Sequence, residues 1–174
     1  MFFNLLSNRE NILAEMAIHV PFCVHSDIKE ALFITHHPDD LVQQAAKHSV
    51  KPKISHEINE HKFFDIIVVD ELINKELLKK VFTALKDDGI VIARSMDGRI
   101  KDDLTLFDSH FRIVMPYHHL NFVFASNFYH PTADLVLQKS DLLDDLYYYN
   151  TEIHTAEFAL PTKMREYLKN QLKN

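Results

Sequence analysis

The chain has 174 residues, a formal net charge of −6 and 47% hydrophobic residues, which suits one domain with a substantial core. The acidic balance and the lack of any run of Lys and Arg argue against a nucleic-acid binder, whose phosphate contacts need clustered positive charges. Cys23 is the only cysteine, so no internal disulfide can form, and no stretch has the pattern of a signal peptide or a membrane span. We therefore expect a cytoplasmic protein with small-molecule or protein partners, and neither nucleic acid nor membrane among them.

Glycine is scarce in this sequence. The chain holds only Gly89 and Gly98, where an average usage of about 7% would give roughly twelve. Loops that cradle phosphates or dinucleotides need glycine because their backbone adopts positive φ angles and approaches the ligand closely. The composition therefore excludes a P-loop and a dinucleotide-binding fingerprint. Any cofactor would have to be held in another way, and we expect none.

The first part of the chain has the pattern of a helix followed by a strand. Residues 9–25 place apolar side chains near helical spacing, and Pro21 limits or kinks this helix. Residues 30–34 are a short apolar run, which predicts a strand. It ends in a polar turn at residues 35–40.

A second helix and a long apolar strand come next. Asp39 or Asp40 is expected to be the N-cap of the helix, and residues 53–57 are a weak strand candidate. Residues 64–70 are a β-branched run that opens and closes on an aspartate, Asp65 and Asp70, which is typical of a strand buried on both faces. Such strands belong to parallel sheets covered by helices.

The central strand is followed by a crossover. An amphipathic stripe from residue 72 to residue 85 predicts a helix that stops at residues 87–89, and residues 89–95 form the next strand. A right-handed crossover makes the two strands parallel. Because ligands of open α/β sheets bind beyond the carboxyl ends of the strands, Asp70 stands where a site is expected.

The remaining residues close the sheet. Residues 100–107 have the pattern of a helix, and residues 111–117 and 120–126 have that of two antiparallel strands. Helical patterns fill residues 140–174. We predict a three-layer α/β fold of about five to seven strands with a mostly parallel centre. The side chains expected in the core are Ile67, Val68, Val69, Leu78, Phe82, Ile90 and Ile92.

Several stretches resemble one known family. The most specific is residues 146–161, Leu-Tyr-Tyr-Tyr-Asn-Thr-Glu-Ile-His-Thr-Ala-Glu-Phe-Ala-Leu-Pro, which closely resembles the C-terminal signature of spermidine synthases. Residues 15–21, 64–70 with 85–89, and 122–126 resemble the family more weakly and in the right order. The resemblance implies a methyltransferase-like, Rossmann-like sheet. It also implies transfer of an aminopropyl group from decarboxylated S-adenosylmethionine to putrescine.

The resemblance also implies a set of site residues. Such a transfer needs an adenosine pocket, carboxylates that hold the diamine and a base that frees the amine lone pair. The candidates for catalysis are Asp70 and Glu71. The candidates for substrate binding are Tyr117 and Glu15. The candidates for the nucleoside side are Asp39, Asp40 and Glu57.

The chain departs from the family at the parts that bind and react. Residues 35–40 stand where the family has a glycine-rich loop. Residues 51–62 stand where it has a strand with a ribose-binding acid, followed by a helix and a further strand. Residues 71–74 replace a gating loop that carries a second aspartate. These changes remove the close backbone approach to a nucleoside.

We therefore predict a single domain over residues 1–174, without the family's N-terminal β-hairpin domain, that is non-catalytic and serves binding or assembly. A polyamine or a nucleoside is the expected ligand. The alternative is an active aminopropyltransferase with a divergent site, which would use decarboxylated S-adenosylmethionine as co-substrate. A cavity beyond Asp70, bounded by residues 35–40 and Tyr117, discriminates the two, because a filled crevice favours the non-catalytic protein. High aromatic usage and the loss of a sheet-covering segment predict a homodimer.

A further hypothesis concerns residues 37–40, His-Pro-Asp-Asp, which resemble the metal-binding turn of LmbE-like zinc deacetylases. In that family the histidine and the second aspartate bind zinc and the first aspartate is the base, roles that fall on His37, Asp40 and Asp39. His118 and His119 are candidates for a third ligand. The simpler interpretation is a helix cap in a solvated turn. Because the histidines are scattered rather than spaced on one helical face, we expect no metal site.

Overall fold

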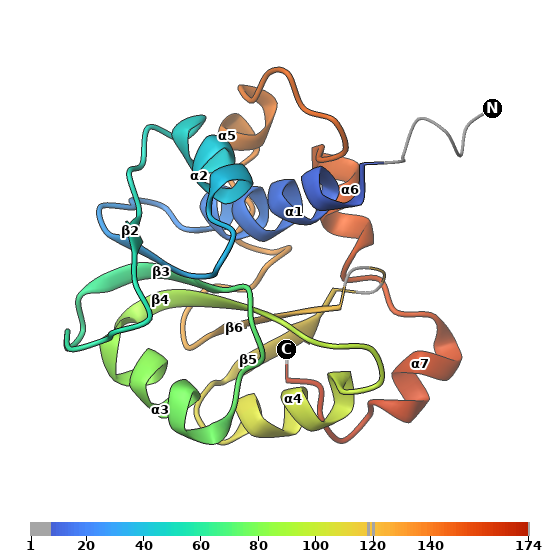
Figure 1. The fold of residues 1–174 in the computed structure, drawn as a ribbon. Helices are drawn as coiled ribbons and strands as arrows, with labels where there is room; N and C mark the ends of the chain where they lie inside the picture. Colours follow the sequence, from blue (N-terminus) through green and yellow to red (C-terminus); the bar gives the residue numbers. More distant parts are fainter. Residues whose placement is uncertain (1–7, 118, 120, 174) are drawn as a thin grey trace.

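The computed structural model describes residues 8–117, 119 and 121–173 (Figure 1). The strands are β1 (Ala31–Ile34), β2 (Lys53–Ile54), β3 (Phe64–Val69), β4 (Leu85–Arg94), β5 (Ile113–Pro116) and β6 (Phe122–Ser126). The helices are α1 (Arg9–Val24), α2 (Asp39–Ala46), α3 (Lys75–Ala84), α4 (Ile100–Asp108), α5 (Leu137–Asp141), α6 (Thr151–Ala156) and α7 (Thr162–Tyr167). Within the described ranges, no helix is both long and apolar enough to cross a membrane.

The strands form one six-stranded sheet in the order β2-β1-β3-β4-β6-β5. The first four strands in this order are parallel, and β6 and β5 are antiparallel to their neighbours. Helices α1, α2, α5 and α6 lie on one side of the sheet and α3, α4 and α7 on the other (Figure 1). The predicted three-layer α/β fold with a parallel centre and a closing antiparallel pair is therefore confirmed.

Strand β3 is the centre of the sheet, as its unbroken apolar run predicts. All six of its residues are buried. Ile66 and Val68 pack into the cluster on the α1 side, while Ile67 and Val69 pack into the cluster on the α3 and α4 side. Because successive side chains of a strand point to opposite faces, a strand covered on both faces is apolar at nearly every position, and the buried Asp65 is the exception here.

Helix α1 is buried almost all round. Thirteen of its sixteen residues are buried, because α2, α5 and the sheet contact it from different sides. Pro21 lies in its last turn, and the helix ends at Val24, which confirms the predicted limit. A helix enclosed in this way carries apolar residues on every face rather than on one stripe, and its buried polar residues Glu15 and His19 have hydrogen-bond partners.

The N-cap of helix α2 differs from the prediction. Pro38 occupies the N-cap position without a side-chain hydrogen bond, and Asp39 and Asp40 lie in the first turn. Neither aspartate is the N-cap, because the helix begins one residue earlier than an aspartate cap requires. Both carboxylates still lie near the positive end of the helix dipole, which is favourable there.

Phe82 is the predicted core residue that the structure places at the surface, with 38% of its area exposed. The buried stripe of α3 runs through Leu78, Val81 and Ala84, so Phe82 lies at its border. There its ring makes edge-to-face contacts with the rings of His110 and Phe111. The other six predicted core residues are buried.

The boundary between α3 and β4 also differs from the prediction. The helix ends at Ala84, and β4 begins directly at Leu85 rather than after residues 87–89. Leu85 pairs with Phe64 of β3, and the next pair is Ile66 with Ile90, so β4 bulges between these points. The helical stripe includes Leu85 because that side chain is buried in either conformation.

Candidate functional site

An open cleft lies beyond the carboxyl ends of the parallel strands. It consists of two adjoining hollows of about 420 and 470 Å³, which we call the strand-end cleft. Both hollows are lined by Glu10, Leu13, Asp70 and Arg94. The start of α1 forms one wall, and the residues that end β3 and β4 form the floor. This is the edge of an α/β sheet where ligands are expected to bind.

The strand-end cleft is rich in carboxylates. Its five acidic lining residues are Glu10, Asp40, Asp70, Glu71 and Asp97. Its two guanidinium groups belong to Arg9 and Arg94. Apolar side chains, including Leu13, Leu41 and Phe122, line the first hollow. The cleft therefore combines an excess of negative charge with apolar walls, a combination that favours cationic ligands with aliphatic stems.

Asp70 is held at the floor of the cleft by two partners. Its Oδ1 atom accepts a hydrogen bond from Nη1 of Arg94 at 2.9 Å, and its Oδ2 atom accepts one from Oγ1 of Thr35 at 3.2 Å. Its backbone N–H donates to the carbonyl of Ile34, so β1 and β3 fix its position. The carboxylate is 19% exposed and lines both hollows. One of its oxygens is already in an ion pair with Arg94.

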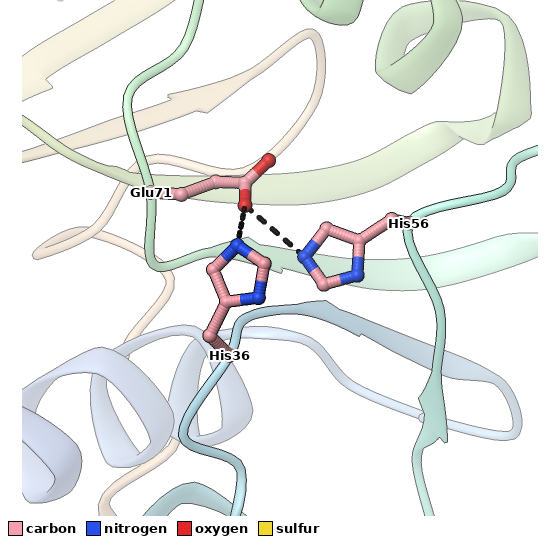
Figure 2. Close-up of side chains that lie close together, drawn as sticks. All are labelled: His36, His56 and Glu71. Carbon is pink, nitrogen blue, oxygen red and sulfur yellow. Dashed lines mark hydrogen bonds and ion pairs between the residues drawn. The ribbon is translucent and has the colours of Figure 1, made fainter.

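The carboxylate of Glu71 faces two histidines (Figure 2). Its Oε2 atom lies 3.1 Å from Nε2 of His56 and 3.6 Å from Nε2 of His36. The two imidazole rings stack with their centroids 4.5 Å apart. Glu71 also lines the second hollow. The two adjacent carboxylates therefore both border the cleft but bind different partners.

The three acids expected on the nucleoside side are separated. Asp40 lines the first hollow beside His37. Asp39 and Glu57 are exposed and are not among the described residues that line the strand-end cleft. Glu57 follows β2 in a turn where its backbone exchanges hydrogen bonds with the hydroxyl of Ser55. Of these three carboxylates, Asp40 is the one in position to meet a ligand in this cleft.

Glu15 lies inside the protein rather than in the cleft. Its side chain is fully buried, and its two oxygens accept hydrogen bonds from the backbone N–H groups of Tyr147, Tyr148 and Tyr149 at 2.7–2.8 Å. It therefore joins α1 to the chain segment that carries the spermidine synthase-like signature. A carboxylate with three backbone donors has no free face for a substrate in this arrangement.

Tyr117 is also outside the cleft. Its ring is buried against Phe122 and Phe158, and its hydroxyl donates to the carbonyl of Met16 at 3.4 Å. Burial raises the pKa of the Tyr117 phenol well above its ordinary value, and Glu157 adds to this. A phenol with such a pKa stays protonated and packs as part of the core. The cavity beyond Asp70 is open and is lined by His37 and Asp40, but Tyr117 is not among its described lining residues.

The signature at residues 146–161 lies in the C-terminal segment, residues 140–174, which we call the tail. Part of this signature is buried in the core as well. His154 is fully buried between the hydroxyl of Tyr149, 2.9 Å from Nδ1, and the carbonyl of Pro131, 2.8 Å from Nε2. Burial lowers the pKa of His154 to about 4, so the imidazole is neutral at pH 7. His154 thus joins the signature to Pro131, in the segment that follows β6.

The described residues do not form the ligand set that a zinc-binding turn at residues 37–40 requires. His37, Asp39 and Asp40 do not bring three ligand atoms within reach of one ion. His119 pairs with Glu157, through its ring at 3.4 Å and its backbone N–H at 3.1 Å, and His118 lies outside the described residues. The structure instead groups His36 with His56 and Glu71.

Two features of the site are not singled out by the sequence patterns. Arg94 ends β4 beside β3, so the rule that places Asp70 at the ligand edge also places Arg94 there. His56 follows β2, a strand of two residues that the sequence indicates only weakly. The contact of His56 with His36 depends on the parallel pairing of β2 with β1. No local sequence pattern predicts this pairing.

Comparison with known proteins gives the family context. No protein-family model matches the chain. It is 26% identical to the polyamine aminopropyltransferase of Helicobacter acinonychis, over 98% of this chain and 81% of that protein. The match runs over 217 residues, so the relative carries residues within the match that this chain lacks.

Solved structures agree in fold. The spermidine synthase from Thermotoga maritima superposes with a TM-score of 0.82 at 23% identity, over 92% of this chain and 74% of that one. A spermidine synthase in complex with the transition state analogue AdoDATO gives the same TM-score, identity and cover of this chain, with 75% of the other chain covered. The near-complete match to the curated relatives supports a shortened member of the spermidine synthase, or polyamine aminopropyltransferase, family, and the solved structures share its fold.

Proposed function

We propose that this chain binds a polyamine in the strand-end cleft and does not catalyse aminopropyl transfer. The observation that carries the proposal is the open, acid-rich cleft whose central carboxylate, Asp70, is bound to Arg94. An open cleft supports ligand binding rather than a role in assembly alone. The Asp70–Arg94 pair and the lost glycine-rich loop argue against catalysis.

The cleft suits an aliphatic amine. Primary ammonium groups are donors without an acceptor, so carboxylates such as Asp40 and Asp97 are their natural partners. The methylene chain between two ammonium groups packs well on apolar walls such as those of Leu13 and Phe122. A nucleoside is a poorer fit, because residues 35–40 place side chains where the family has glycine.

The ion pair between Asp70 and Arg94 argues against catalysis. A base that frees the amine lone pair must offer an oxygen to the substrate ammonium, and Oδ1 of Asp70 already accepts from Arg94. The guanidinium of Arg94 also places a positive charge beside the position of the reacting groups, where a sulfonium substrate would bring another. Each effect weakens the transition state that the family reaction requires.

An active aminopropyltransferase is the second candidate, and the open cleft beyond Asp70 favours it. Relatives named polyamine aminopropyltransferase cover almost the whole chain, and a spermidine synthase of the same fold binds AdoDATO. In that case decarboxylated S-adenosylmethionine would be the co-substrate and Asp70 the base. Either candidate treats residues 1–174 as one domain with its site at the edge of the sheet.

Calorimetric titration with putrescine, spermidine, decarboxylated S-adenosylmethionine and methylthioadenosine tests the proposal. We expect saturable binding of an amine and none of methylthioadenosine. Asp40→Asn should weaken amine binding by about threefold to tenfold, the effect of one partly exposed charge pair. Asp39→Asn is the matched control, because it removes a neighbouring carboxylate that lies outside the cleft, and it should leave the affinity within about twofold.

The same samples decide between the two candidates. Incubation of the protein with putrescine and decarboxylated S-adenosylmethionine should release no methylthioadenosine above a sample without protein. Turnover that is lost in Asp70→Asn would establish the second candidate instead. Absence of binding for both putrescine and spermidine, with the protein shown to be folded, would overturn polyamine binding altogether.

A further inference from the structure

We propose that His36, His56 and Glu71 bind one divalent transition-metal ion of the zinc class (Figure 2). Each residue offers one ligand atom, and the three atoms lie within 4.8 Å of one another. Two of the three ligands, the histidines, are not among the described residues that line the strand-end cleft, whereas Glu71 also lines its second hollow. The proposal does not require that a polyamine binds there.

Two of the three distances between the ligand atoms are close to those around a tetrahedral ion. Zinc bonds of about 2.0–2.1 Å to nitrogen and oxygen place neighbouring ligand atoms roughly 3.3 Å apart at the tetrahedral angle. Oε2 of Glu71 lies 3.1 Å from Nε2 of His56 and 3.6 Å from Nε2 of His36. Both imidazoles thus point the same nitrogen at the same carboxylate (Figure 2). The third pair of ligand atoms, the two histidine nitrogens, lies within 4.8 Å.

The backbone supplies the three ligands from three neighbouring strands. His36 follows β1, His56 follows β2 and Glu71 follows β3, and β1 pairs in parallel with both of the others. Parallel pairing brings the carboxyl ends of these strands to one edge of the sheet, so the three ligand side chains can converge there. Residues 36, 56 and 71 are far apart in the sequence, so the cluster is a product of the sheet order.

The side chains are accessible to an ion from solution. His36 is 72% exposed and His56 42% exposed, while Glu71 is the least exposed of the three at 25%. An exposed site leaves a fourth position for water and gives the ion an entry path. Such a site holds its metal less firmly than an enclosed one, because the unliganded side chains keep more rotamer freedom.

The ligand types select the metal. Two imidazoles and one carboxylate suit Zn²⁺, Ni²⁺, Cu²⁺ or Co²⁺, whereas Mg²⁺ and Ca²⁺ prefer sites made wholly of oxygen. Bound there, an ion would fix the loops after β1, β2 and β3 to one another. Glu71 also lines the second hollow, so the ion would set the orientation of one wall of the cleft.

Calorimetric titration of the metal-stripped full chain with ZnCl₂ tests this site, with MgCl₂ as the control metal. We expect one Zn²⁺ per chain and no heat from Mg²⁺. Removal of a direct ligand in His36→Ala or His56→Ala should weaken Zn²⁺ binding by at least the roughly 10- to 100-fold that follows loss of a supporting partner. Circular dichroism confirms that each variant is folded.

His37→Ala is the matched control, because it removes the next exposed histidine in the same turn. It should leave the stoichiometry and affinity unchanged. Loss of binding in His37→Ala with binding intact in His36→Ala would assign the ion to the turn at residues 37–40 and overturn the proposal. So would weak binding of several ions per chain that neither His36→Ala nor His56→Ala reduces, since scattered surface histidines would then be the ligands. A visible spectrum of the Co²⁺-loaded chain, typical of tetrahedral coordination and absent in His56→Ala, is the second readout.

Discussion

Single residues in this chain show how a charged side chain can become structural. Glu15 is fully buried on α1, without a cationic partner among the described residues, and receives three backbone N–H groups from the tail. Three donors to one carboxylate offset the cost of removing the charge from water. The stretch around Glu15 and the tail signature both carry the family resemblance. In this fold they are the two sides of one contact.

Glu15→Gln should destabilise the protein by about 2–4 kcal/mol. An amide keeps a single acceptor oxygen and turns its NH₂ group toward a backbone donor, so at least one buried N–H loses its partner. Urea denaturation followed by circular dichroism measures the change. Glu57→Gln, the same substitution at an exposed position, is the control and should stay within about 0.5 kcal/mol of the parent. Equal stability of the two variants would contradict a structural role for Glu15.

At the scale of elements, the α3–β4 junction is the point where local pattern and tertiary pairing compete. Leu85 continues the apolar stripe of the helix, yet it starts β4 because it pairs with Phe64. The chain then bulges before Ile90 rejoins the ladder. Gly89 lies in this bulge, and a Cβ atom there would lie 2.5 Å from Cγ of Leu85 and 3.1 Å from the carbonyl of Lys86.

Gly89→Ala should therefore cost more stability than Gly98→Ala. Gly98 has a φ of 80°, and no other atom lies within 4 Å of the position that a Cβ atom would occupy. Its alanine variant therefore suffers only backbone strain of about 1–2 kcal/mol. The alanine at position 89 must also displace the buried Leu85 side chain. In a Leu85→Ala background the extra cost of Gly89→Ala should shrink, which a double-mutant cycle by urea denaturation detects. Additive costs would show that Leu85 is not the obstacle.

The predictability of the elements follows their burial. The central strand is predictable because burial on both faces leaves an unbroken apolar run, and α1 ends at the proline-containing turn that the sequence indicates. Strand β2 is exposed and two residues long, so it leaves only a weak pattern. The end of α3 is not predictable locally, because a buried leucine satisfies both a helix and a strand.

The whole molecule decides which predicted site residues meet. Asp70 and Arg94 follow from the rule for strand ends, since that rule needs only the strand positions. Burial of Tyr117 depends on how the tail packs over the sheet, and no periodicity contains that information. The grouping of His36 with His56 likewise depends on strand order. The homodimer stays a prediction that light scattering at tens of micromolar protein tests.

Burial keeps several histidines of this fold neutral at pH 7. Nδ1 of His19 lies 2.9 Å from Nε2 of His48, and Nε2 of His19 lies 3.1 Å from Oε1 of Gln44. Burial lowers the pKa of His19 to about 4 and that of His48 to about 3. The two facing nitrogens share one proton between them, so a second proton would break the contact. His154 is another such residue.

Acid should therefore destabilise the whole molecule before its carboxylates are protonated. An unfolded histidine binds its proton near pH 6.5, whereas folded His154 does so only near a pKa of about 4. Between these values the unfolded state holds more protons, so stability is complete above about pH 7 and falls as the pH drops toward 4. His154 alone should contribute a loss of roughly 2–3 kcal/mol by about pH 4.5. Urea denaturation across this range measures it: His154→Gln should lose stability less steeply with falling pH, while His61→Gln, at an exposed position, should keep the parent's slope. A parent whose stability is constant from pH 7 to about pH 4.5 would contradict the buried neutral state of these histidines.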